Sequence, residues 1–235
     1  AAFLLFLAML LALYMLSKFQ RDSNLTLSNV GGGGFDAIKN SLKVDEIRNI
    51  ASYVWIWTAL MTIQWITAIG IVEEWSQNSE QRIRFFAIVE QVISPLTLIV
   101  QLFFTNIIIK RFGIRNIMFS YGILFLFAYL AYGLAPSIIS VGIVTVLLRI
   151  FEYGINKPTR ETIFTTFEKN DRYKSTVFID TFVSRFGDLS GSGFIALGKL
   201  TSIATNSFPL IAVPIAGYLS FLGIKISKKT QFKDL

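Results

Sequence analysis

Residues 149–188 read RIFEYGINKPTRETIFTTFEKNDRYKSTVFIDTFVSRFGD, and this stretch joins two hydrophobic segments through a region rich in charges of both signs. Ionisable side chains continue from that region into the hydrophobic segment on either side. A charged side chain within a bilayer costs about 2.5–3.5 kcal/mol on insertion scales, so such residues usually face a bundle interior, form ion pairs or serve function. If its flanking segments span a membrane, this stretch carries the main functional signal of the chain.

The composition is typical of an integral membrane protein. The chain of 235 residues is 53% hydrophobic and only 16% charged, whereas soluble domains carry about 25% charged residues. It contains no cysteine and no histidine, which excludes disulfides and thiol catalysis and argues against transition-metal sites. We therefore expect no enzymatic activity, no metal and no cofactor. The net charge of +7 would suit binding to nucleic acid or to an anionic membrane surface. Because of the way the charges are distributed along the chain, we expect a membrane surface and no nucleic acid.

Seven apolar runs are predicted to be membrane-spanning helices, because a span needs about 20 mostly apolar residues. Residues 1–17 lack the basic start of a signal peptide and are interpreted as the end of a helix that begins before this sequence. Residues 18–47 form a polar linker with a flexible run of four glycines, and residues 227–235 form a tail. Between them, the predicted bundle of 48–226 contains spans at 49–72, 85–109, 117–134, 137–156, 176–200 and 208–226.

Lysine and arginine are distributed unequally between the two sides of this predicted topology. One side holds seventeen, which are Lys18, Arg21, Lys39, Lys43, Arg48, Lys110, Arg111, Arg115, Lys157, Arg160, Lys169, Arg172, Lys174, Lys225, Lys228, Lys229 and Lys233. The other side holds three, which are Arg82, Arg84 and Lys199. Because short cytoplasmic loops carry an excess of positive charge, the linker, a charged loop at 157–175 and the C-terminus are predicted to be cytoplasmic.

The candidate site consists of polar residues near the cytoplasmic ends of the fourth and fifth spans of the bundle. They are Arg149, Glu152, Asn156, Lys157, Arg160, Glu161, Asp180, Arg185 and Asp188. Arg149 and Glu152 are three residues apart, as are Arg185 and Asp188, so each pair shares a helix face and can form an ion pair. These residues either line and gate a polar path, or form a structural network that orients two helices while long side chains reach the interface.

Two local features of this region carry further structural predictions. Pro158 disfavours helical backbone at Lys157, so the fourth span is expected to end or kink there. Gly187 and Gly191 form a G-x-x-x-G step, which lets helix backbones approach closely, so this face of the fifth span is expected to pack on another helix.

Residues 156–188 resemble the signature between the tenth and eleventh helices of one branch of the major facilitator superfamily. That branch contains bacterial proteins similar to the ATP:ADP antiporters of intracellular bacteria and plastids. The signature is Pro-x-Arg-Glu-x-(Leu/Ile)-(Phe/Tyr)-Thr, then (Arg/Lys)-(Tyr/Phe)-Lys, Ile-Asp-Thr and Arg-x-Gly-Asp. The matching residues are Pro158, Arg160, Glu161, Phe164, Thr165, Tyr173, Lys174, Ile179, Asp180, Thr181, Arg185, Gly187 and Asp188.

The resemblance implies an all-α integral membrane fold, namely the six-helix C-terminal bundle of a major-facilitator transporter plus the end of the preceding helix. It implies a multi-pass protein of a bacterial inner membrane that contacts lipid and an N-terminal six-helix half. The implied function is secondary active transport of a nucleotide or another organic anion by alternating access, with Arg149, Lys157 and Arg185 as available cations. The alternative is a receptor or scaffold that has the transporter fold but transports nothing.

Overall fold

The computed structural model describes residues 9–11, 13–15, 44–167, 169–200 and 207–229. The chain forms two compact units, residues 1–32 and residues 33–235. In the first unit, residues 9–11 and 13–15 are helical. The rest of the predicted first span, the linker as far as residue 43 with its glycine run, and the tail from residue 230 lie outside the described residues.

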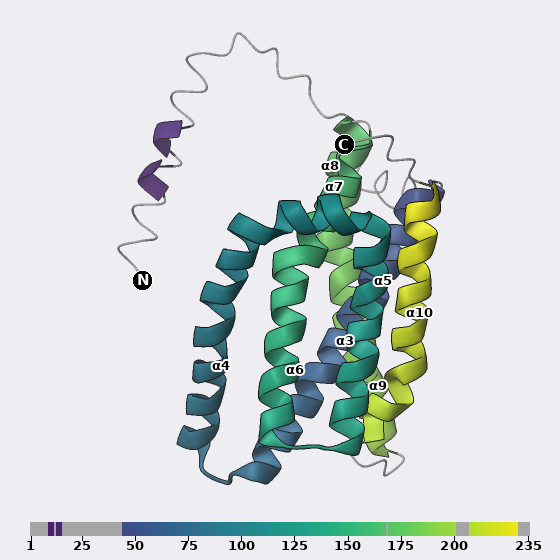
Figure 1. Cartoon of the computed structure of the whole chain (residues 1–235). Coiled ribbons are helices and arrows are strands. Elements are labelled where there is room, and N and C mark those ends of the chain that lie inside the picture. Colours follow the sequence, from purple (N-terminus) through teal and green to yellow (C-terminus); the bar gives the residue numbers. More distant parts are fainter. Residues whose placement is uncertain (1–8, 12, 16–43, 168, 201–206, 230–235) are drawn as a thin grey trace. The chain divides into compact units, whose positions relative to one another are not determined.

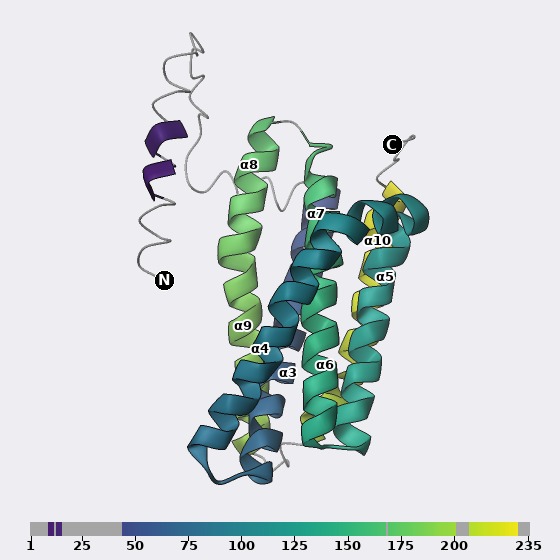
Figure 2. The same ribbon diagram turned by 60° about the vertical axis from the view of Figure 1, so that its left-hand side comes forward.

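The described residues of the second unit form helices and turns without any β-strand, which confirms the predicted all-α class for this part of the chain. The α-helices are α3 (Asp45–Trp75), α4 (Ser79–Ile99), α5 (Thr105–Leu134), α6 (Ile138–Phe151), α7 (Lys157–Phe164), α8 (Lys169–Phe178), α9 (Ser184–Leu200) and α10 (Phe208–Lys229). Among the described residues, three π-helical turns each join two consecutive α-helices, and the chain stays helical through them: η1 (Val100–Phe104), η2 (Glu152–Asn156) and η3 (Ile179–Val183). Figure 2 shows α8 and α9 to the left of α6 and α7, with α5 and α10 to their right.

Within the part of the chain that the structure describes, four stretches are long and apolar enough to cross a membrane, as a multi-pass membrane protein requires. They are Asp45–Trp75, Ser79–Leu134, Ile138–Phe164 and Phe208–Ile226. The second has 56 residues and contains two of the predicted spans, which run in opposite directions from a bent connection in Figure 1. The helix from α8 to α9 contains the predicted span 176–200 but is not one of the four, and it carries three of the charged candidate residues.

The helix α5 consists of two helical parts that are joined by a kink at one glycine. Gly113 has φ 73° and ψ 157°, a backbone conformation that is sterically unfavourable for residues with a Cβ atom. It lies within the basic sequence Lys110–Arg115. Glycine thus allows the chain to turn between two apolar segments where the arginine and lysine side chains are concentrated.

Close approach between helix backbones is most evident where α9 meets α3. A Cβ atom added to Gly187 would lie 2.6 Å from the carbonyl oxygen of Trp55, and one added to Gly191 would lie 2.5 Å from that of Ala59. Neither distance can be accommodated without a shift of the backbone. The predicted packing role of the G-x-x-x-G step is confirmed, and α3 is the helix on which it packs.

Of the two outcomes expected for the fourth span at Lys157, an end or a kink, the end does not occur. The chain remains helical through η2 and α7 to Phe164, and α8 begins at Lys169, so helices replace most of the predicted loop at 157–175. Pro158 occupies one of the first two positions of α7, and η2 lies immediately before it. A π-turn relaxes the local hydrogen-bond register, which lets the helix continue past a residue that has no N–H group.

Candidate functional site

A polar pocket of about 400 Å³ lies among α3, the segment from η2 to α7, and the segment from η3 to α9. We refer to it as the polar pocket. Six of the nine predicted site residues line it: Glu152, Lys157, Arg160, Asp180, Arg185 and Asp188. These are three bases and three acids, so the lining has no formal net charge when all six are ionised.

Arg160 is the most deeply buried cation of the polar pocket. Only 2% of its side chain is exposed, and its guanidinium lies 3.9 Å from a carboxylate oxygen of Glu152 and 3.6 Å from one of Asp180. Both distances exceed those of hydrogen bonds, and neither Nε nor Nη1 has a hydrogen-bond partner. The guanidinium also lies over the ring of Trp57, 5.2 Å from the ring centroid. Arg160 therefore lines the cavity as a buried cation, with two enclosed nitrogens that have no hydrogen-bond partner.

Glu152 is equally buried, and side chains that do not line the polar pocket hold its carboxylate in place. Its Oε2 accepts a hydrogen bond of 2.6 Å from the side-chain amide of Asn156, whose Oδ1 accepts one of 3.0 Å from the hydroxyl of Tyr53. The other carboxylate oxygen, Oε1, has no hydrogen-bond partner. Asn156, a predicted site residue, thus orients Glu152 and does not itself line the cavity.

The α9 side of the polar pocket is more open. The predicted pair of Arg185 and Asp188 forms, with 3.2 Å between Nη1 and Oδ2, and the second oxygen of Asp188 accepts a hydrogen bond from Thr62 on α3. The side chain of Arg185 is 83% exposed. Since ion pairs in water contribute little, Arg185 remains available for another anion.

The predicted pairing of Arg149 with Glu152 is wrong. Arg149 instead pairs with Glu90 of α4, at 3.2 Å, and its guanidinium lies within 6 Å of the ring centroids of Trp65 and Tyr153. Both residues lie at or before the start of η2, where the helix keeps its α-helical spacing, but Glu90 reaches Arg149 from α4 and Asn156 bonds to Glu152. Arg149 therefore lies outside the polar pocket and links α6 to α4.

Other pocket residues have no charge and were not predicted from the sequence. Trp57, Thr58 and Met61 line the polar pocket from α3, and the indole of Trp57 donates a hydrogen bond to the hydroxyl of Tyr121. Nothing in an apolar span distinguishes such residues from lipid-facing ones until the neighbouring helices are known. Glu161, the remaining predicted residue, does not line the cavity.

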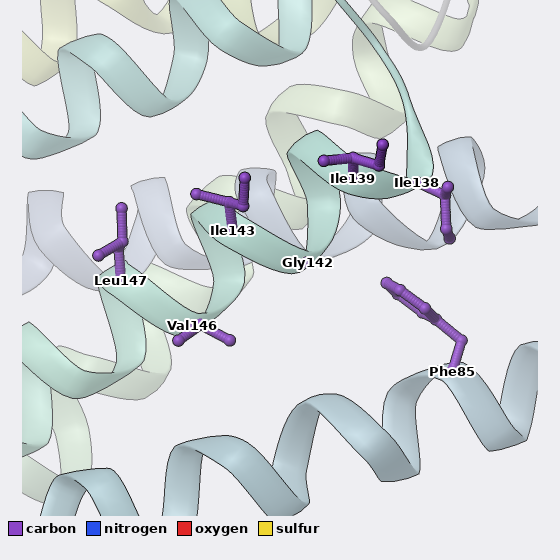
Figure 3. Close-up of a pocket in the computed structure, with 7 residues that line it drawn as sticks. All are labelled: Phe85, Ile138, Ile139, Gly142, Ile143, Val146 and Leu147. Atoms are coloured by element: carbon purple, nitrogen blue, oxygen red, sulfur yellow. The ribbon is translucent and has the colours of Figure 1, made fainter.

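A second cavity, of about 440 Å³, lies between α4 and α6 and differs in chemistry. Phe85, Ile138, Ile139, Gly142, Ile143, Val146 and Leu147 line it, and Figure 3 shows only apolar side chains. It offers no group that binds a polar substrate. The polar pocket is therefore the candidate functional site, because it brings together ionisable side chains of both signs.

Comparison of the chain with family models, with curated proteins and with solved structures gave no match.

Proposed function

We propose that this chain is the C-terminal six-helix half of a major-facilitator-type secondary transporter that moves a nucleotide or another organic anion. The resemblance of residues 156–188 to the signature of that branch supports the proposal. The residues of the signature that line a cavity in this chain are charged ones, among them Arg160, Asp180, Arg185 and Asp188. A cavity lined by ionisable groups between membrane helices is what a transport pathway for an ion requires.

The observation that carries the proposal is the unsatisfied guanidinium of Arg160. A buried donor without a partner costs free energy, more so for a charged group, and a charge in a membrane helix costs more still. The carboxylates of Glu152 and Asp180 balance the charge at 3.9 and 3.6 Å without taking up the N–H groups of Nε and Nη1. If the side chains that enclose these donors move aside, a phosphate or carboxylate ligand would accept hydrogen bonds from them, and arginine favours such planar, bidentate contacts.

The same geometry offers a route from binding to movement. Arg160 belongs to α7 and Asp180 to η3, so their ion pair joins the two helical segments that flank the polar pocket. An anion bound to Arg160 would compete with Asp180 and weaken this connection. Substrate binding would thereby allow the segment from α8 to α9 to move relative to α7, as alternating access demands.

The proposal is tested by exchange of radiolabelled nucleotides, and of di- and tricarboxylates, in liposomes that contain the purified full-length protein. We expect exchange by the parent protein and a loss of at least tenfold in Arg160→Gln. Arg115→Gln, which removes an exposed arginine of the α5 segment, should retain exchange. Absence of exchange for every anion would refute the transport proposal, and binding without exchange would favour the receptor or scaffold.

A further inference from the structure

Three π-helical turns occur within the described helices, although π-helices account for well under 1% of residues in proteins and are often found at functional sites. Two of them contain an acidic residue of the polar pocket, Glu152 in η2 and Asp180 in η3. The third, η1, contacts η2 and contributes no residue to the polar pocket. The contact of η1 with η2 therefore needs a structural explanation.

The turn η2 places Arg160 on the same side of its helix as Glu152. These residues are eight apart, and in an α-helix, with about 100° per residue, they would lie about 80° apart around the axis. A π-turn accommodates one extra residue, which removes about 100° and leaves a difference of about 20°. Asp180 and Asp188 on the opposite wall of the cavity are also eight apart, and Asp180 lies within η3, which ends at Val183.

The turn η2 leaves backbone acceptors without their usual donors. The N–H of Lys157 bonds to the carbonyl of Glu152, so it does not reach the carbonyl of Tyr153 four residues before it. The next residue, Pro158, has no N–H, and in an α-helix it would have been the donor to the carbonyl of Gly154. Unpaired carbonyls inside a membrane protein are costly, so another group must satisfy them.

Two side chains at η1 supply these hydrogen bonds. The amide of Gln101 donates to the carbonyl of Tyr153 at 2.9 Å, and the hydroxyl of Thr105 donates to the carbonyl of Gly154 at 2.5 Å. The helices approach closely here because residue 154 is glycine, where an added Cβ would lie 2.7 Å from the side chain of Val100.

From this geometry we infer that Gln101 and Thr105 are positioning residues of the polar pocket. By satisfying the carbonyls of Tyr153 and Gly154 they hold η2 in its π-helical register, which keeps Arg160 facing Glu152. Without these bonds, a return of η2 to the α-helical register would rotate α7 by about 100° and carry Arg160 away from the cavity. This role in ligand binding rests on the proposed function, whereas the effect on helix register does not.

The register of α7 can be measured directly with spin labels, because these 235 residues contain no cysteine. Spin labels at Arg115→Cys on α5 and Thr165→Cys at the end of α7, both exposed positions, report the orientation of α7 by electron–electron double resonance. Gln101→Met and Thr105→Val remove the hydrogen bonds with little change in volume. Thr105→Ser, which keeps the hydroxyl, is the matched control.

We expect the double variant Gln101→Met/Thr105→Val to shift the distance distribution or to add a second population, while Thr105→Ser keeps the parent distribution. The single variants should show smaller shifts and decide the question if the double variant does not fold. An unchanged distribution in the folded double variant, or in both folded single variants, would overturn the inference.

Exchange kinetics then separate this inference from the proposed function. If the parent protein transports, the KM of Thr105→Val should rise about tenfold, the size expected when the substrate loses one hydrogen bond to the charged Arg160. Thr105→Ser should keep the KM of the parent. If the parent transports nothing, the proposed function fails, and the spin-label distances alone decide whether Gln101 and Thr105 hold the turn.

Discussion

Arg149 and Arg160 lie on the same continuous helical segment, yet their surroundings differ completely. Arg149 pairs with Glu90 at 3.2 Å and packs over two aromatic rings, whereas Arg160 is buried, 3.6 Å from its nearest carboxylate, with two N–H-bearing nitrogens unpaired. Both would cost free energy in hydrocarbon without a partner. The satisfied arginine connects two helices, and the unsatisfied one is the residue that we propose to bind the anion.

The largest expected effect is that of Arg160→Gln on anion exchange. Loss of a buried, hydrogen-bonding charge typically costs 2–5 kcal/mol or more, so kcat/KM should fall by about a hundredfold or more. Uptake of labelled substrate into proteoliposomes measures it. Arg149→Gln is the matched control, and an equal loss in both variants would remove the distinction between the two arginines.

Glu152→Gln should destabilise the protein strongly because it leaves the charge of buried Arg160 without its buried partner. Removal of one member of a buried ion pair costs about 3 kcal/mol or more. Thermal unfolding in detergent measures the loss, and an anionic ligand should restore much of the stability by replacing the carboxylate. A ligand that stabilises the parent as much as this variant would contradict competition between Glu152 and substrate.

Asp180→Asn should have a smaller effect than these variants, and it should raise the affinity for the anion. Asp180 is 37% exposed and lies 3.6 Å from Arg160, so its contribution is that of a partly solvated pair. Removal of this competitor should lower the KM for the anion about two- to fivefold. A raised KM would instead place Asp180 among the groups that bind the substrate.

The smallest effect is expected for the pair outside the polar pocket. Arg149→Gln and Glu90→Gln should each lower stability by about 1 kcal/mol or less, because both side chains are partly exposed. A double-mutant cycle on the unfolding free energies isolates the pair from other contacts of either residue. Transport should persist in all three variants, and its loss would return Arg149 to the functional site.

The membrane class and the helical fold of the described residues follow from the sequence because apolar length and charge distribution are local properties. Six of the nine candidate residues line the polar pocket, namely Glu152, Lys157, Arg160, Asp180, Arg185 and Asp188. In contrast, the partner of Arg149 was misassigned because spacing along one helix cannot reveal that Glu90 approaches from α4. The alignment of Glu152 with Arg160 could not be predicted either, because spacing arguments assume 3.6 residues per turn, and the π-turn η2, which is supported from η1 about 50 residues earlier in the chain, breaks that assumption.

The residues that support the site were harder to predict for a related reason. In the sequence, Gln101 and Thr105 are ordinary polar residues within an apolar span, and Pro158 suggests the end of a helix. Their structural role is clear only once η1 and η2 are known to lie side by side. Pro158 leaves the carbonyl of Gly154 without a donor, and Thr105 supplies the hydrogen bond. No sequence pattern within one helix contains that information.

The most direct test of the central claim is thermal unfolding of the intact, detergent-purified protein with a panel of nucleotides and carboxylates. A ligand that binds only the folded state at a hundred times its Kd stabilises it by about 2.7 kcal/mol, which is readily seen as a rise in Tm. We predict such a rise for at least one anion in the parent and in Arg149→Gln, and none in Arg160→Gln. A rise of equal size in Arg160→Gln would show that the polar pocket does not bind anions through this arginine.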